Sequence, residues 1–199
     1  MRWLPRMVFA TCLFLYAAAA VCGDFQKGWK AYNSLDYATA KAEWEALADA
    51  GDAKAAYGMG LLYGNGFGVD MNDEMALKYY LIAAQQGHGD AAFSLAVMHQ
   101  NGWGVPPSDE TANKWYRIAA IKGNTEAQMA LGRYYAMDFL DTYDPVEAYK
   151  WFSLAEKLGD YGAAEKREFV GSRMTPEQIA AARALVDTWL EENNIRIDE

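Results

Sequence analysis

Small, aromatic and glycine positions recur along the chain at a constant spacing of 36 residues. The positions in register are Ala40, Ala76, Ala112 and Ala148; Trp44, Tyr80, Tyr116 and Phe152; and Gly51, Gly87, Gly123 and Gly159. A period between about 20 and 50 residues indicates stacked supersecondary units. The chain is therefore expected to be a repeat protein.

Polar positions within each unit predict two helices joined by a tight turn. The expected N-caps of the first helices are Asp36, Asn72, Ser108 and Asp144. Pro145 is expected at the first helical position after Asp144, and Glu147 is expected to complete a capping box with Asp144. The recurring glycine suits the left-handed residue that ends a helix. At the position after it, Asp52, Asn124 and Asp160 are expected to cap the second helices, whereas His88 is not a standard cap.

The second helix of each unit carries small residues followed by larger apolar ones. These are Ala55, Ala91, Ala127 and Ala163, and then Met59, Leu95 and Leu131. Neither helix of a pair can bury its apolar face alone, so the pairs must stack. The expected fold is all-α: a right-handed α-solenoid of about four antiparallel helix-pair repeats with a C-terminal capping helix.

The repeats are expected at residues 36–71, 72–107, 108–143 and, in degraded form, 144–171, within a solenoid spanning 24–171. Before them, a helix over 25–33 would cover the open end with Phe25, Trp29 and Tyr32. After them, residues 172–193 predict a capping helix that starts at Thr175, where Gln178 can close a capping box. Its apolar stripe is Ile179, Ala182, Val186 and Trp189. Residues 194–199 are expected to be a frayed tail.

The repeated residues resemble the Sel-one-like repeat (SLR) family, a relative of the tetratricopeptide repeat. In one unit the shared residues are Ala76, Tyr79, Tyr80, Ala83, Ala84, Gly87, Ala91 and Leu95, followed by Gly102-Trp103-Gly104-Val105. The next unit repeats them as Ala112, Trp115, Tyr116, Ala119, Ala120, Gly123 and Ala127, followed by Leu131-Gly132-Arg133-Tyr134-Tyr135. The resemblance implies a protein-interaction scaffold without catalysis of its own, and it implies no particular partner.

The first 23 residues have the layout of a secretory signal peptide. Arg2 and Arg6 precede an uncharged apolar run over 7–21, which is shorter than the roughly 20 residues of a membrane span. Cleavage is expected after Gly23, with cleavage after Ala20 or lipidation at Cys22 as alternatives. The protein is therefore expected to be periplasmic or secreted.

The cysteine count and the net charge limit the functions that the mature protein can have. Removal of residues 1–23 takes away both cysteines, which leaves no disulfide framework or thiol nucleophile. It also removes two arginines and no acidic residue, so the formal net charge changes from −9 to −11. An acidic surface disfavours nucleic acid and anionic lipid and favours basic patches on a partner protein.

No pattern of catalytic or metal-binding residues stands out, and no cofactor is expected. His88 and His99 are eleven residues apart, which is not the spacing that places two ligands on one helix face. Residues 64–68 are glycine-rich, but they lack the lysine that meets a phosphate and are expected to form a tight connection. The third connection, residues 136–142, has no glycine and must take another shape.

Two rows of aromatics are candidate partner-binding residues. Phe67, Trp103 and Phe139 lie 36 residues apart in the connections and form a predicted loop row. The alternative is that each of them folds back over the helices beneath it. Tyr79, Trp115 and Trp151 form a predicted helix row on the first helices, where packing between repeats is the alternative to partner contact.

The leading functional expectation is an exported, monomeric, non-catalytic scaffold that binds another envelope or secreted protein, in a signalling or secretion setting. A binder of cell-wall glycan, using exposed Trp and Tyr, is the second expectation. A hydrolase is the third, because some cysteine-rich relatives have been proposed to be hydrolases. The present chain lacks the cysteines of that group after signal removal.

Overall fold

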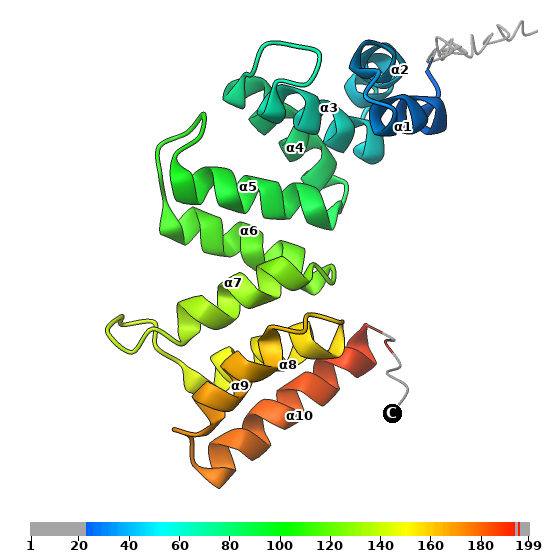
Figure 1. Cartoon of the computed structure of the whole chain (residues 1–199). Coiled ribbons are helices and arrows are strands. Elements are labelled where there is room, and N and C mark those ends of the chain that lie inside the picture. Colours follow the sequence, from blue (N-terminus) through cyan, green and yellow to red (C-terminus); the bar gives the residue numbers. More distant parts are fainter. Residues whose placement is uncertain (1–22, 194, 196–199) are drawn as a thin grey trace, which may run out of the picture.

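The computed structural model describes residues 23–193 and 195, and within those ranges it contains ten α-helices and no strand. The helices are α1 Phe25–Asn33, α2 Tyr37–Asp49, α3 Ala53–Asn65, α4 Asp73–Gln85, α5 Gly89–Asn101, α6 Asp109–Ile121, α7 Thr125–Tyr135, α8 Pro145–Lys157, α9 Ala163–Gly171 and α10 Pro176–Glu192. They stack in chain order along one elongated array (Figure 1). Apart from Gly23 and Ile195, the predicted signal peptide and the predicted tail lie outside the described residues.

Helices α1 to α9 each pack mainly against their neighbours in the chain, whereas α10 packs back on α8. The recurring alanines of both helices are buried where the helices meet, and small side chains there allow the backbones to approach closely. The aromatics in register, Trp44, Tyr80, Tyr116 and Phe152, are also buried and fill the space between helices. The predicted all-α solenoid is confirmed.

The turn inside each helix pair is a Schellman motif. Gly51, Gly87, Gly123 and Gly159 have φ values of 91°, 85°, 86° and 102°, in the left-handed region. The next residue donates its amide to a carbonyl near the end of the first helix, as Asn124 does to Ala119 at 3.1 Å. The glycines end the helices as predicted.

The residue after the glycine also caps the next helix. The side chains of Asp52 and Asn124 accept the amides of Ala55 and Ala127, each at 2.8 Å. His88, which the sequence reasoning did not treat as a cap, plays the same role through Nδ1, which accepts the Ala91 amide at 3.4 Å. An unprotonated imidazole nitrogen is an acceptor, so it can replace a carboxylate oxygen here.

The first helices begin at the predicted caps, since the side chains of Asp36, Asn72, Ser108 and Asp144 all accept first-turn amides. The predicted capping box between Asp144 and Glu147 is wrong. The Asp144 amide already donates to the Tyr135 carbonyl at 3.0 Å. The Glu147 carboxylate instead accepts from Lys150 at 2.6 Å and from the indole of Trp151 at 2.8 Å.

The last helix pair departs from the pattern at its second helix. Asp160 accepts the amide of Gly162 at 2.8 Å and shapes a turn. Helix α9 therefore begins only at Ala163, with Gly162 as its N-cap, and it has 9 residues where α3 and α5 each have 13. The prediction that Asp160 caps this helix is wrong, because the chain makes an extra turn before the helix starts.

Both ends of the array are covered by the predicted terminal helices. On α1, the Phe25 and Trp29 rings lie 6.0 and 6.1 Å from the ring of Trp44, so they cover the first helix pair. Helix α10 begins with the predicted capping box between Thr175 and Gln178. Of its predicted stripe, Ala182, Val186 and Trp189 are buried.

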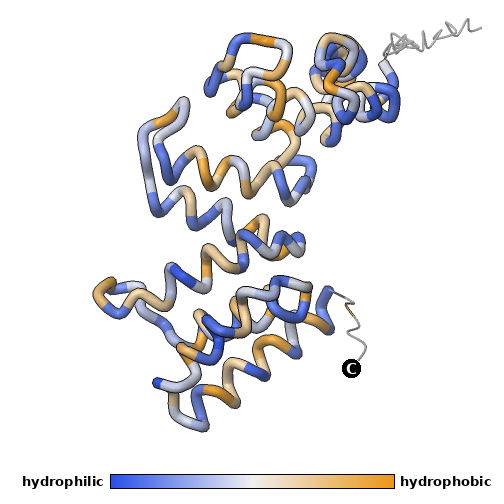
Figure 2. Tube along the Cα trace, in the orientation of Figure 1, coloured by the Kyte–Doolittle hydropathy of each residue, from blue (hydrophilic) through white to orange (hydrophobic). Residues whose placement is uncertain are grey.

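Hydrophobic and hydrophilic segments alternate along the helices, as expected when each helix buries part of its surface against its neighbours (Figure 2). Across residues 23–193, no helix is both long enough and apolar enough to cross a membrane.

Candidate functional site

The predicted loop row divides in the structure, because its first member packs inward. The ring of Phe67 stacks on Tyr37 at a centroid distance of 4.8 Å and an angle of 11°, and it lies 6.2 Å from the ring of Tyr32. Phe67 is only partly exposed and packs against the main apolar cluster. For this residue the alternative interpretation, folding back over the helices, describes the structure.

The other two members of the loop row face solvent. Trp103 is 50% exposed and Phe139 is 79% exposed. The reason lies in the first residue of the helix beneath each loop. Phe67 stacks on Tyr37, but the residue 36 positions later is Asp73, and Asp109 follows after another 36. A carboxylate offers no ring to stack on, so the later aromatics stay in water.

The third connection takes a different shape, as its lack of glycine predicted. In the first two connections, both glycines have φ near +70°. In the third, the amides of Leu140 and Tyr143 donate to the carbonyls of Met137 and Leu140, at 3.2 and 3.0 Å. These successive short-range bonds hold Phe139 and Leu140 at the tip of the connection.

The predicted helix row is mostly buried. Tyr79 is 2% exposed and Trp151 is 3% exposed, whereas Trp115 is partly exposed. The Tyr79 hydroxyl donates to Asp49 at 3.4 Å, and burial, with Asp49 nearby, raises the Tyr79 pKa to about 12. Trp151 belongs to the same buried cluster as Val186 and Trp189 of α10. Two of the three residues therefore connect neighbouring helices and present little surface.

A third row, which the sequence reasoning missed, lies beside the loop row. It consists of the residues that immediately precede the first-helix caps: Leu35, Met71, Pro107 and Tyr143. All four are exposed, Leu35 by 72% and Met71 by 69%. Leu35 also has φ of 63°, which is uncommon for a residue other than glycine. The common 36-residue spacing was the signal that could have revealed this row.

We call five of the exposed apolar residues in the three connections the connection edge: Met71, Trp103, Phe139, Leu140 and Tyr143. Around them the sequence is acidic: residues 66–76, 102–113 and 136–147 contain nine Asp or Glu and no Lys or Arg. The connection edge therefore combines apolar side chains with negative charge. A partner surface that offers apolar groups next to basic ones would be complementary to it.

Three grooves run between successive second helices, at positions related by the repeat. The groove between α3 and α5 is lined by Tyr80 and measures about 170 Å³. The groove between α5 and α7 is lined by Tyr116 and consists of two hollows of about 160 and 400 Å³. Residues of the following connections, Trp103 and Leu140, line these two grooves, so each groove adjoins the connection edge.

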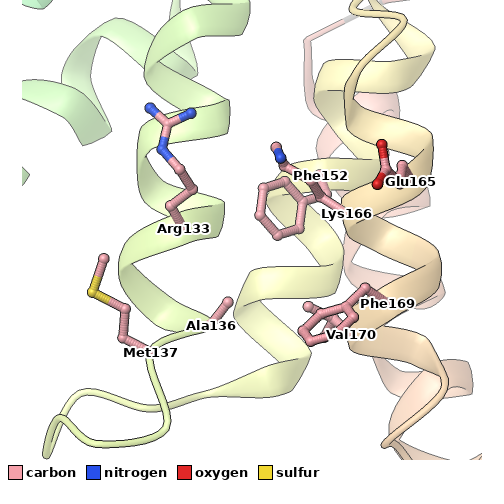
Figure 3. A pocket seen from close by; sticks show the side chains of 8 residues that line it. All are labelled: Arg133, Ala136, Met137, Phe152, Glu165, Lys166, Phe169 and Val170. Atoms are coloured by element: carbon pink, nitrogen blue, oxygen red, sulfur yellow. The ribbon is translucent and has the colours of Figure 1, made fainter.

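The third groove, between α7 and α9, measures about 320 Å³ and is lined by Ala136, Met137, Phe152, Phe169 and Val170, together with charged residues (Figure 3). Gly132 lets the Phe152 ring approach α7, because a Cβ there would lie 2.5 Å from the ring. The ring is thereby held between the two helices and lines the groove with apolar surface.

Both histidines belong to α5, His88 as its N-cap and His99 in its last turn. His88 caps α5 and stacks on Tyr57 at 4.4 Å, and burial lowers the His88 pKa. His99 is partly buried near the end of α5. In the described part of the chain, no group of three or more His, Cys, Asp or Glu residues is arranged to hold a metal ion. The described features are those of a helical-repeat protein with solvent-facing apolar surfaces.

The Sel1 repeat model matches residues 53–88, 89–124 and 125–160, so the chain belongs to the Sel1 repeat family. These units have the same 36-residue length as the repeats defined above, but each begins at the second helix of a pair. Sel1 repeat proteins are protein-interaction scaffolds, and their repeats typically bind other proteins.

Two solved structures illustrate the similarity. One is a Sel1 repeat protein from Oxalobacter formigenes, with 29% identity and a TM-score of 0.69, covering 72% of this chain and 59% of that one. The other is a protective antigen present in uropathogenic Escherichia coli strains that displays an SLR fold. It has 24% identity and a TM-score of 0.50, covering 84% of this chain and 44% of that one. The chain thus spans less than two thirds of the length of either. The comparison with curated proteins gave no match.

Proposed function

We propose that the protein is an exported, non-catalytic scaffold that binds another protein through the connection edge. The observation that carries the proposal is the solvent exposure of Trp103 and Phe139 in register on a strip that bears no positive charge. Large exposed aromatics are typical anchors of protein interfaces. The buried Tyr79 and Trp151 offer much less surface to a partner.

The charge of the edge defines the partner's chemistry. Asp70, Asp138 and Asp141 are exposed beside the apolar residues of the edge. The partner is proposed to present basic side chains next to apolar ones, so that association is faster at low salt. The signal-like leader supports export to the periplasm or beyond. Mass spectrometry of the purified protein tests this, because cleavage after Gly23 would leave Asp24 at the N-terminus.

In-cell crosslinking of the tagged chain, expressed behind its own leader, tests the binding surface. An edge variant carries Trp103→Ser, Phe139→Ser and Leu140→Ser, and leaves the packed Phe67 unchanged. A matched control carries serine at three exposed apolar residues of the first helices, Leu81, Ile118 and Ile121. Circular dichroism must show both variants folded.

Crosslinked protein partners should be lost from the edge variant and retained by the control. If only the control variant loses its crosslinked partners, the binding surface lies on the first helices and the proposed connection edge is wrong. If the wild-type chain, folded and exported, crosslinks to no protein, the scaffold function itself is wrong.

A further inference from the structure

The third groove, unlike the first two, is not lined by the connection that follows its later helix. The first two grooves are each lined in part by the connection that follows the later helix, through Trp103 and Leu140. After α9 the chain passes through four residues directly into α10, and none of those four lines the third groove. Its volume of about 320 Å³ reaches the range of ligand sites.

The charge around this groove is opposite to that of the molecule as a whole. Arg133 and Lys166 line it, and the Arg173 guanidinium lies 4.1 Å from the ring centroid of Phe169. Glu165 is the carboxylate among the lining residues. The chain carries a net charge of −9, and the connection edge has no basic residue. The groove is thus a basic, apolar site on an acidic protein.

The two lining cations have no salt-bridge partner among the described residues. Neither Arg133 nor Lys166 forms a salt bridge with any residue in 23–193. The adjacent Arg167, in contrast, is paired with Glu156 at 3.2 Å. In the view of Figure 3, the charged ends of Arg133 and Lys166 point toward the same end of the groove, and the Phe152 ring lies between the helices that carry them.

We propose that this groove binds a segment of a partner protein that presents an apolar side chain next to a carboxylate. The apolar side chain would pack on Met137 and Phe169, which line the groove and are 39% and 57% exposed in the free protein. The carboxylate would be held by Arg133 and Lys166, whose donors are otherwise left to solvent. This site has the opposite charge preference from the connection edge, and the inference does not depend on binding at that edge.

Nuclear magnetic resonance of the ¹⁵N-labelled chain, purified as the cell processes it, tests the proposal with three capped tetrapeptides. The first is acetyl-Glu-Leu-Phe-Glu-amide, the second replaces both glutamates with lysine, and the third replaces Leu-Phe with Ser-Ser. At about 0.1 M salt, charges more than about 10 Å away are largely screened. The nearby Asp138 and Asp141 of the third connection are the same in all the proteins compared.

The first peptide should shift the amides of Ala136, Met137 and Phe169 and bind at least about tenfold more tightly than the other two, a ratio equal to about 1.4 kcal/mol. A pocket variant, Arg133→Glu with Lys166→Glu, should lose this binding and prefer the lysine peptide. A control, Lys30→Glu with Arg183→Glu, makes the same change in net charge at exposed residues that do not line the groove. It should bind the first peptide within about twofold of wild type.

Three results would overturn the proposal: equal binding of the first two peptides, shifts that map outside the groove, or unchanged binding by the pocket variant. The residues of the connection edge are intact in all of these proteins. A failure here is therefore distinguishable from a failure of the edge variant to lose its partner.

Discussion

Phe67 and Phe139 occupy equivalent positions in their repeats, yet the structure predicts very different costs for removing them. Phe67 stacks on Tyr37 at 4.8 Å and packs against the apolar cluster. Burial of such a ring contributes about 1.5–3 kcal/mol, and the ring pairing adds about 0.5–1.5 kcal/mol. Phe67→Ala should therefore lower the free energy of unfolding by about 2–4 kcal/mol.

Phe139 is 79% exposed, so only about a fifth of the burial contribution is present. Phe139→Ala should cost less than about 0.6 kcal/mol. Urea denaturation followed by circular dichroism at 222 nm measures both values. Phe67→Leu serves as the control, because it keeps much of the apolar volume and loses only the ring pairing, at a cost of about 1 kcal/mol.

If Phe67→Ala and Phe139→Ala destabilise the protein by equal amounts, the assignment of one ring to the core and the other to the surface is wrong. The result also governs the binding experiment, since Phe67 can be omitted from the edge variant only if its role is structural. A cost of several kcal/mol for Phe139→Ala would show that the third connection folds onto the helices beneath it.

Two further predictions concern the turns between paired helices. Gly123 has φ of 86°, and a Cβ there would meet no atom within 4 Å, so the cost of Gly123→Ala comes from backbone strain alone. Gly123→Ala should lower the free energy of unfolding by about 1–2 kcal/mol in urea denaturation, and Gly123→Asn should cost less because Asn tolerates this region. Equal stability of wild type and the alanine variant would contradict the turn assignment. Burial lowers the His88 pKa below its ordinary value of 6.5. As the pH falls, the imidazole is therefore protonated in the unfolded chain before it is protonated in the folded protein. The free energy of unfolding should consequently be full above pH 6.5 and fall as the pH is lowered below that value. His88→Asn keeps a cap that does not titrate, and should lose less stability between pH 7.5 and 5.5 than wild type; identical losses would show that His88 does not titrate differently in the two states.

The two proposed surfaces would give the scaffold different selectivities. The connection edge is acidic, with exposed Trp103 and Phe139, and suits basic partners. The third groove is basic, with Arg133 and Lys166, and suits a segment bearing carboxylates. Raising the salt concentration should weaken both interactions, and charge reversal at either surface should affect binding at that surface most.

Local features of the chain were enough to predict the solenoid. The N-caps at Asp36 and Asn72, the turn glycines and the capping box at Thr175 depend on residues only a few positions apart. Helix ends are governed by such short-range hydrogen bonds, and the 36-residue period repeats the same solution. Where the local argument failed, as for Glu147 and Asp160, another nearby partner had taken the bond.

The sequence by itself thus determined the helices, their pairing and their stacking, because these follow from short-range bonds and a repeated apolar pattern. Tertiary structure alone decided which aromatics face solvent. Phe67 is covered because Tyr37 lies beneath it, whereas Trp103 and Phe139 meet no such ring. It also decided that the third groove stays open, since α9 leads directly into α10 without a covering connection. Exposure depends on which residues of neighbouring repeats meet in space, and spacing along one chain does not specify that.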